Sequence, residues 1–161
     1  MIVVRAVTMD DDLMLLVSEI NSATWDQANE MSTYDTEGLS EYLRGQDTVF
    51  LACHDVVEGR RTLLGMASAR LQTKPYGQER WLYVDEVDVC ADQRRRGAGT
   101  ALMKELLAIA DHAACNEVWL GADAENVSAN ALYRSLSPDD VARVVGYTYD
   151  LATRVAIPTH S

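Results

Sequence analysis

Apolar positions in the first third of the chain recur with periods that separate strands from helices. The β-branched run at residues 2–7 predicts a strand. Residues 13–20 place leucine, valine and isoleucine at helical spacing, directly after three aspartates that favour a helix N-terminus. The polar stretch 21–34 has no clear period, whereas residues 39–43 predict a second short helix that ends at Gly45.

The middle of the chain predicts three strands in succession. Residues 48–53 and 62–71 are rich in apolar and β-branched side chains, and the polar stretch 54–61 between them predicts the turn of an antiparallel hairpin. A Lys-Pro-Tyr-Gly loop at 74–77 precedes a third strand at 81–89, in which apolar and acidic residues are mixed.

The last part of the chain alternates helix and strand. A basic, glycine-bearing turn at 94–99 leads into the clearest helix, 100–114, which carries an apolar stripe. A strand at 117–122 and a short helix at 129–136 follow, and a Ser-Pro pair ends that helix. A final strand is predicted at 143–151, and the last ten residues are expected to fray.

These elements predict a single domain over residues 1–161, of the α/β class. No repeat, low-complexity tract or linker divides the chain. Because a meander comes first and alternating helices and strands follow, the predicted sheet is mixed and has helices on both faces.

The segment with the clearest chemistry is VDVCADQRRRGAG, residues 87–99. It runs from a strand through a turn into a helix, and the unpaired N–H groups at a helix start attract anions. Gly97 and Gly99 let an anion approach the backbone closely. Three consecutive arginines, 94–96, add donors suited to phosphate. The segment therefore predicts a cradle for a pyrophosphate.

Two motifs in this order resemble the GNAT superfamily of acetyl-CoA-dependent N-acetyltransferases. One is Arg94-x-x-Gly97-x-Gly99 after Val87-x-Val89, and the other is Asn126-x-x-Ala-x-Ala-Leu-Tyr133. The resemblance covers roughly residues 48–136. It implies the GNAT fold, a mostly antiparallel sheet of about six or seven strands that splays into a V where the cofactor enters.

The resemblance also implies that acetyl-CoA is the cosubstrate and which residues hold it. A backbone N–H near Val89, where the strand bulges away from its neighbour, would bind the developing oxyanion. Thr100 would add a hydroxyl to a phosphate or cap the helix locally. The residues expected to bind the cofactor are Val87, Val89, Arg94, Arg95, Arg96, Gly97, Ala98, Gly99, Thr100 and Asn126.

Amine acetylation needs a base and benefits from an acid at the departing thiolate. Glu86 is the expected base, with Asp85 and Asp88 as alternatives. Strand alternation predicts that Glu86 and Asp88 share one face and that Asp85 lies on the other. The resemblance assigns the acid to Tyr133, because a phenol is protonated at neutral pH. The same side chains could instead serve as an acidic rim and a core aromatic.

Within the superfamily, residues 48–89 look like the aminoglycoside 3-N-acetyltransferases. The chain departs from the superfamily pattern at three places. Ala91 stands where many members have proline, Gln93 stands where many have an aromatic residue, and the usual Gly-Phe or Gly-Ile after Tyr133 is missing.

Composition adds a strong negative charge, −11, from 14 basic and 25 acidic residues. Such a charge argues against nucleic-acid binding, which needs a basic face. Two basic and twelve acidic residues fall within 1–59, so almost all of the excess lies in this segment. Either this segment faces a cationic partner, or its helices have acidic, solvated faces. The resemblance implies that the segment lies on the acceptor side and faces a cationic small-molecule amine. The first candidates there are Asp26, Glu30, Asp35 and Glu37.

Three cysteines with no metal-ligand spacing predict neither a disulfide framework nor a metal site, as is typical of a cytoplasmic protein. No signal-peptide pattern or membrane-spanning run is present, so no membrane partner is expected. Because members of the superfamily are often dimers, a homodimer is one expected state.

Three functions remain open from the sequence. The first is acetylation of a primary amine on a cationic small molecule, with an aminoglycoside as the leading example, by direct attack in a ternary complex. The second is N-acetylation of a protein or peptide. The third is a CoA-binding module without catalysis.

Overall fold

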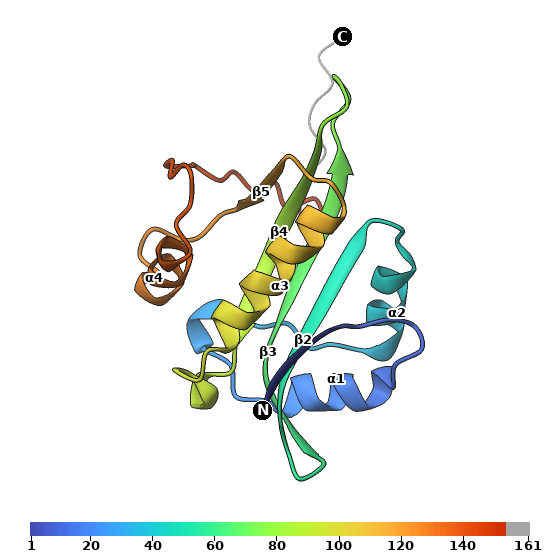
Figure 1. Cartoon of the computed structure of the whole chain (residues 1–161). Helices are drawn as coiled ribbons and strands as arrows, with labels where there is room; N and C mark the ends of the chain where they lie inside the picture. The colour runs from blue at the N-terminus through green and yellow to red at the C-terminus, as the bar shows by residue number, and fades with distance from the viewer. Residues whose placement is uncertain (154–161) are drawn as a thin grey trace.

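The computed structural model describes residues 1–153, which form one five-stranded sheet with helices on both faces (Figure 1). The strands lie in the order of the chain: β1 (Ile2–Ala6), β2 (Thr48–Val57), β3 (Arg60–Thr73), β4 (Arg80–Val89) and β5 (Glu117–Leu120). Neighbouring strands are antiparallel from β1 to β4, and β4 pairs with β5 in parallel. The predicted mixed sheet with helices on both faces is therefore confirmed.

The helices also follow the predicted order. They are α1 (Leu13–Ser22), α2 (Thr36–Arg44), α3 (Ala98–His112) and α4 (Val127–Ser135), with two 3₁₀ turns, η1 (Gln27–Asn29) and η2 (Ala91–Gln93). Aspartates start the first two helices, because Asp12 accepts from the N–H of Leu15 and Asp35 accepts from that of Gly38.

Two apolar cores divide the sheet by face. One face of β2, β3 and β4 packs against α3, where Leu102 and Leu106 are fully buried. The other face packs against α1 and α2, with Phe50 of β2 among Ile20 and Leu39. Figure 1 shows α3 crossing the sheet on one side and α4 standing beyond β5 at its edge.

The turn of the β2–β3 hairpin is shorter than the sequence predicts. Residues 54–57 and 60–61, predicted as turn, continue the two strands, and only Glu58 and Gly59 form the connection. Both have positive φ, 49° and 76°, as in the type I′ turn that matches the twist of a hairpin. The side chains at this exposed end of the hairpin are mostly polar, so the hydrophobic pattern of the sequence does not indicate a strand there.

The predicted strand at 143–151 and the expected sixth and seventh strands are not observed in the part of the chain that the structure describes. Residues 141–150 have irregular backbone, and their apolar side chains are largely exposed, among them Val145 and Tyr147. A β-branched and aromatic segment needs a neighbouring strand to satisfy its backbone, and none is paired with it here. The prediction that the last ten residues fray falls almost entirely outside residues 1–153.

Gly65 of β3 allows β3 and β4 to approach beside the end of β4. A Cβ at this position would lie 2.5 Å from the carbonyl oxygen of Asp88 and 3.3 Å from Cα of Val89. We expect Gly65→Ala to lower the free energy of unfolding by about 1–3 kcal/mol, because the two strands must separate to admit it. Urea denaturation measures this change.

Gly77→Ala serves as the matched control for that substitution. A Cβ at Gly77 would meet no atom within 4 Å, so the midpoint of unfolding should stay close to the wild-type value. Equal midpoints for Gly65→Ala and wild type would contradict the close approach of the two strands.

Within residues 1–153, no helix has both the length and the apolar character needed to span a membrane.

Candidate active site

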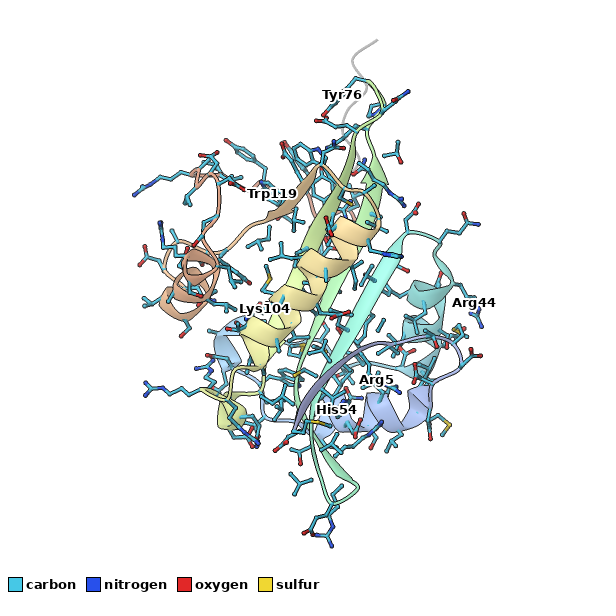
Figure 2. All side chains as sticks on the ribbon, in the orientation of Figure 1. Arg5, Arg44, His54, Tyr76, Lys104 and Trp119 are labelled. Atoms are coloured by element: carbon cyan, nitrogen blue, oxygen red, sulfur yellow. The ribbon has the colours of Figure 1, made fainter. Side chains whose placement is uncertain are left out.

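A pocket opens where β4 and β5 separate. The two strands pair only through residues 81–84 of β4 and 117–120 of β5, while β4 continues to Val89. Trp119, which lies at the paired end of the strands in Figure 2, packs its ring against Tyr83 of β4. After β5 the chain leaves β4 and leads into α4. A pocket of about 230 Å³ lies between β4 and this part of the chain. The predicted V-shaped splay is present in the structure.

The pocket is lined by residues of β4, β5, α4 and η1 and of the loop between β5 and α4. β4 contributes residues 84–88, the end of β5 and the loop after it contribute 120–123, and the α4 region contributes Asn126, Ala129 and Tyr133. Asn29 of η1 also lines it.

A β-bulge at Asp85 sets which side chains of β4 face this pocket. Ala69 of β3 pairs with Val84 and Ser68 pairs with Glu86, so Asp85 is an extra residue on β4. The alternation shifts by one at this point, and Val84 before the bulge and Val87 after it pack against the same core beside α3.

The bulge corrects two expectations from the sequence. Ala69 of β3 faces α3, so its neighbours Ser68 and Arg70 lie on the other face of the sheet. Glu86 pairs with Ser68 and Asp85 forms an ion pair with Arg70, so both carboxylates lie on that other face. Asp85 therefore does not lie on the face opposite Glu86. The bulge also lies at Asp85, not near Val89, where the resemblance implies it.

Asp88 is the most deeply buried carboxylate of the pocket, with 9% of its surface exposed. Its Oδ1 accepts a hydrogen bond from Nδ2 of Asn29 at 3.3 Å. Burial, together with the nearby charge of Glu86, raises the pKa of Asp88 to about 6, and the Asn29 hydrogen bond opposes this shift. The carboxylate is therefore suited to accept a proton near neutral pH.

Glu86 and Asp85, the two carboxylates expected to be catalytic along with Tyr133, are both exposed. Glu86 lines the pocket without being buried in it, and Asp85 lies 3.3 Å from Nε of Arg70. Both side chains lie at the pocket's exposed side, so they can hold a cation there.

Tyr133 of α4 lines the same pocket. Its ring also packs against the core beside α3, so Tyr133 both contributes to the core and lines the pocket. Burial and the charge of Asp88 raise the pKa of Tyr133, which keeps the phenol protonated at neutral pH. Asn126 lines the same pocket and caps α4, accepting the N–H of Ala129 at 3.0 Å.

The predicted cradle lies at the N-terminus of α3, directly after β4 and η2. Gly97 is the N-cap residue with φ 84°, and no side chain caps this helix start. The N–H groups of Ala98, Gly99 and Thr100 therefore belong to an uncapped first turn, where the helix dipole favours an anion. Thr100 lies inside the helix and is not its cap.

Two of the three cradle arginines are held by carboxylates from the first third of the chain. Arg94 Nη2 lies 2.6 Å from Asp26, and Arg96 forms an ion pair with Asp55 of β2. Among the described residues no ion pair forms at Arg95, which is exposed and adopts a positive φ of 62°.

Gly99 has a packing role that the sequence interpretation did not include. A Cβ at this position would lie 2.9 Å from Cδ2 of Leu132, so the absence of a side chain lets α4 pack against the start of α3. A Cβ on Gly97 would meet nothing within 4 Å, which leaves the space above the cradle open.

A family comparison agrees with this geometry. Residues 14–137 match the model of the acetyltransferase (GNAT) family. The chain belongs to the GNAT family. It is therefore an acetyltransferase, and the family uses acetyl-CoA as the acetyl donor.

Solved structures with this GNAT fold include aminoglycoside acetyltransferases. The fold is similar to that of meta-AAC0020, an aminoglycoside acetyltransferase from an uncultured soil metagenomic sample, in complex with sisomicin. The TM-score is 0.78 at 20% identity, covering 93% of this chain and 96% of that one. AAC(6')-Iy, in complex with a CoA bisubstrate analogue, gives a TM-score of 0.68 at 13% identity, over 93% and 99% of the two chains.

Protein acetyltransferases share the fold as well. The ribosomal-protein-alanine N-acetyltransferase of Brucella melitensis biovar Abortus 2308 gives a TM-score of 0.67 at 18% identity, covering 92% of this chain and 98% of that one. No curated protein sequence matches the chain.

The acidic first third of this GNAT acetyltransferase does not form the wall of the pocket. Asn29 is the lining residue that comes from 1–59, and the carboxylates of the lining are Asp85, Glu86, Asp88 and Asp123. Asp26 and Asp35, two of the four residues singled out from the sequence, serve as N-caps instead. Much of the charge of this segment is thus used in caps and ion pairs.

Asn29 and Asp123 are pocket residues that sequence reasoning missed. Asn29 falls in the polar stretch 21–34, which has no period to interpret. Asp123 lies in the loop after β5, where it accepts the N–H of Glu125. A carboxylate three residues before the motif asparagine, Asn126, was the available signal for Asp123.

The cysteines do not form a nucleophilic centre in the described part of the chain. Cys53 and Cys90 are buried in the two cores, and burial raises the pKa of their thiols to about 11 and about 12. Residues 1–153 also hold no group of three or more His, Cys, Asp or Glu residues that could bind a metal ion.

Proposed function

We propose that this protein transfers the acetyl group of acetyl-CoA to a primary amine of a cationic small molecule, by direct attack in a ternary complex. The observation that carries the proposal is the pocket between β4 and α4. This pocket lies beside the part of β4 that has no β5 partner, and its lining includes a buried carboxylate with a raised pKa, Asp88, and a protonated phenol, Tyr133.

The residues at the cofactor end fit a diphosphate joined to an extended arm. The uncapped start of α3, with open space above Gly97, offers backbone donors, and Arg95 offers a guanidinium. The edge of β4 that faces the pocket leads from there past Val89 and Val87 toward Tyr133, and it has no strand partner within residues 1–153. When bound, acetyl-CoA supplies an acyl thioester whose sulfur leaves as a thiolate.

In the proposed reaction Asp88 receives the proton of the acceptor ammonium. An ammonium has no lone pair, so it must lose a proton before the nitrogen can attack the thioester carbonyl. Because Asp88 is buried and its pKa is about 6, it is ionised at pH 7.5 and basic enough to share that proton. Glu86, exposed at the mouth, holds the incoming cation. This proposal replaces the expectation that Glu86 is the base.

Tyr133 supplies a proton to the departing sulfur. The phenol remains protonated at neutral pH because burial and Asp88 raise its pKa. A hydroxyl at this place on α4 lies in the same pocket as the carboxylates, so one site holds both the proton acceptor and the proton donor.

Four carboxylates in one lining favour an acceptor with more than one amine. Asp85, Glu86, Asp88 and Asp123 line a space of small-molecule size, with the Arg70 guanidinium beside Asp85. Aminoglycosides carry several ammonium groups on one scaffold, and the similar fold of the enzyme bound to sisomicin makes them the first acceptors to test.

A thiol-release assay tests the proposed function. Purified protein, acetyl-CoA and a panel of aminoglycosides, linear polyamines and basic peptides are mixed, and free CoA thiol is measured. We expect release with at least one multiply charged amine. Turnover of basic peptides alone would show a protein acetyltransferase, and CoA binding with no release from any amine would show a module without catalysis.

Arg95→Ala is expected to weaken binding of CoA by about tenfold at low salt, since a phosphate contact from an exposed guanidinium contributes of the order of 1 kcal/mol. The loss should shrink as salt rises, because exposed charges are screened. Isothermal titration of CoA at two ionic strengths measures both effects. Arg134→Ala, on the exposed end of α4, is the matched control and should leave the Kd unchanged.

A further inference from the structure

One short segment, residues 24–29, touches both halves of the site. The carbonyl of Thr24 accepts the N–H of Ala91, which lies between β4 and the cradle, at 2.7 Å. Asp26 forms an ion pair with Arg94 of the cradle at 2.6 Å. Asn29 donates to Asp88 in the pocket at 3.3 Å. The segment therefore joins the phosphate end of the cofactor site to the carboxylate proposed as base.

Asp26 has two bonds that use different oxygens of one carboxylate. Oδ2 holds the guanidinium of Arg94, and Oδ1 accepts the N–H of Ala28 at 3.0 Å and so caps the turn η1. The last residue of that turn is Asn29. The carboxylate that binds Arg94 is thus also the cap of the turn that ends at Asn29. Loss of Arg94 from Oδ2 can therefore affect the position of the Asn29 side chain.

The Arg94–Asp26 pair is exposed enough to exchange partners. The two side chains are 45% and 36% exposed, and an ion pair at such a surface holds its partners weakly. A diphosphate presents more negative charge to Arg94 than one carboxylate does, and it also accepts two parallel N–H bonds.

The surroundings of Asp88 make it sensitive to the loss of one donor. Glu86 neighbours it on β4 and Cys90 lies directly after that strand. Tyr133 faces it from α4, and Tyr34 approaches from the segment before α2. All of these groups are either anionic or neutral at pH 7. The amide of Asn29 is the group that lowers the pKa of this carboxylate.

We propose that Asp26 and Asn29 are positioning residues that couple the cofactor site to Asp88. When a diphosphate takes the guanidinium of Arg94, Asp26 is released, η1 loosens, and Asn29 withdraws from Asp88. The carboxylate then becomes more basic and more accessible to the amine after the cofactor has bound. The inference rests on the proposed function.

Hydrogen exchange of the amides in residues 24–31 tests the coupling without measuring activity. In wild type, addition of CoA should raise their exchange rates about two- to fivefold, because an exposed ion pair of this strength is lost. Asp26→Asn should show the faster exchange without CoA. Titration calorimetry should also show a two- to fivefold lower Kd for CoA in this variant. CoA no longer has to break the Arg94–Asp26 ion pair there, so the gain in binding free energy should equal the free energy of that pair.

Asp55→Asn is the matched control. It removes the same charge from the partner of another cradle arginine, Arg96, but lies on β2 outside the segment. We expect this variant to leave the exchange of residues 24–31 at the wild-type rate. Equal acceleration in both variants, or unchanged exchange on CoA binding in wild type, would overturn the coupling.

The Asn29 part of the proposal has its own readout. Asn29→Ala should raise the titration midpoint of Asp88 in the CoA-free protein, followed by carboxyl NMR, because there Asp88 loses a hydrogen bond to its charged form. An unchanged midpoint would show that Asn29 does not position Asp88. If wild type binds no CoA, the proposed function itself fails; if CoA binds and the exchange is unaffected, only the coupling fails.

Discussion

Tyr133→Phe is expected to lower kcat by about 10²-fold or more and to leave the Kd for CoA nearly unchanged. The substitution removes one oxygen from a ring that packs against the core beside α3, so the packing of α4 should persist. The lost atom is the proton donor proposed for the departing thiolate. Steady-state kinetics with the best acceptor, and titration of CoA by calorimetry, measure the two quantities separately.

Tyr147→Phe provides the control for this prediction. Tyr147 is 81% exposed in the irregular segment after α4, and its hydroxyl lies outside the pocket lining. Its kcat should equal that of wild type. A Tyr133→Phe enzyme with full kcat would assign Tyr133 to packing alone and remove the general acid from the mechanism.

Asp88→Asn is expected to lower kcat/KM at pH 7.5 by about 10²- to 10⁴-fold, the range that removal of a general base produces. In wild type the free carboxylate should give kcat/KM an acid limb with a midpoint near its pKa of about 6. Activity falls as the pH drops through this value, because protonated Asp88 cannot accept a proton. The variant should lack this limb.

The same substitution should make the protein more stable at neutral pH. Burial raises the pKa of Asp88 in the folded state above the ordinary value of 3.8, so the folded protein favours the protonated form. This contribution stabilises the protein at low pH and is lost as the pH rises through about 6. Asp88→Asn should therefore raise the free energy of unfolding at pH 7.5 by about 1–3 kcal/mol, without a matching gain at pH 4.

Glu86→Gln separates the two candidate bases. Glu86 is exposed, so its substitution should raise KM for the amine more than it lowers kcat and should leave stability close to wild type. If Asp88→Asn loses activity and gains stability while Glu86→Gln does neither, the result supports Asp88 as the base. The reverse pattern of activities would return the role of base to Glu86.

Local pattern was enough to predict most of the fold. In α1 and α2 an aspartate cap and an apolar stripe lie within a few residues of one another, and in α3 the stripe directly follows Gly97, so the sequence carries both signals together. The cradle was predictable for the same reason: Gly97, its positive φ and the helix that follows form one contiguous unit. The family motifs around Arg94 and Tyr133 likewise lie in short continuous stretches.

The β-bulge at Asp85 shows what local pattern could not supply. Alternation along residues 81–89 is apparent in the sequence, but the extra residue exists only relative to β3, where Ser68 and Ala69 pair on either side of it. That shift decided which carboxylates share a face. The missing strand at 143–151 has a similar origin, because strand-forming residues become a strand only when another strand lies beside them.

The sequence by itself determined the family motifs, the anion-binding helix start and the concentration of acidic residues in 1–59. Tertiary structure alone decided how those charges are used: Asp26 and Asp55 hold cradle arginines that lie far along the chain, and Asn29 meets Asp88. Burial of Asp88, which raises its pKa and makes it the proposed base, likewise depends on what surrounds it. Capping and periodicity act between near neighbours in the chain, whereas ion pairing and desolvation depend on distance in space.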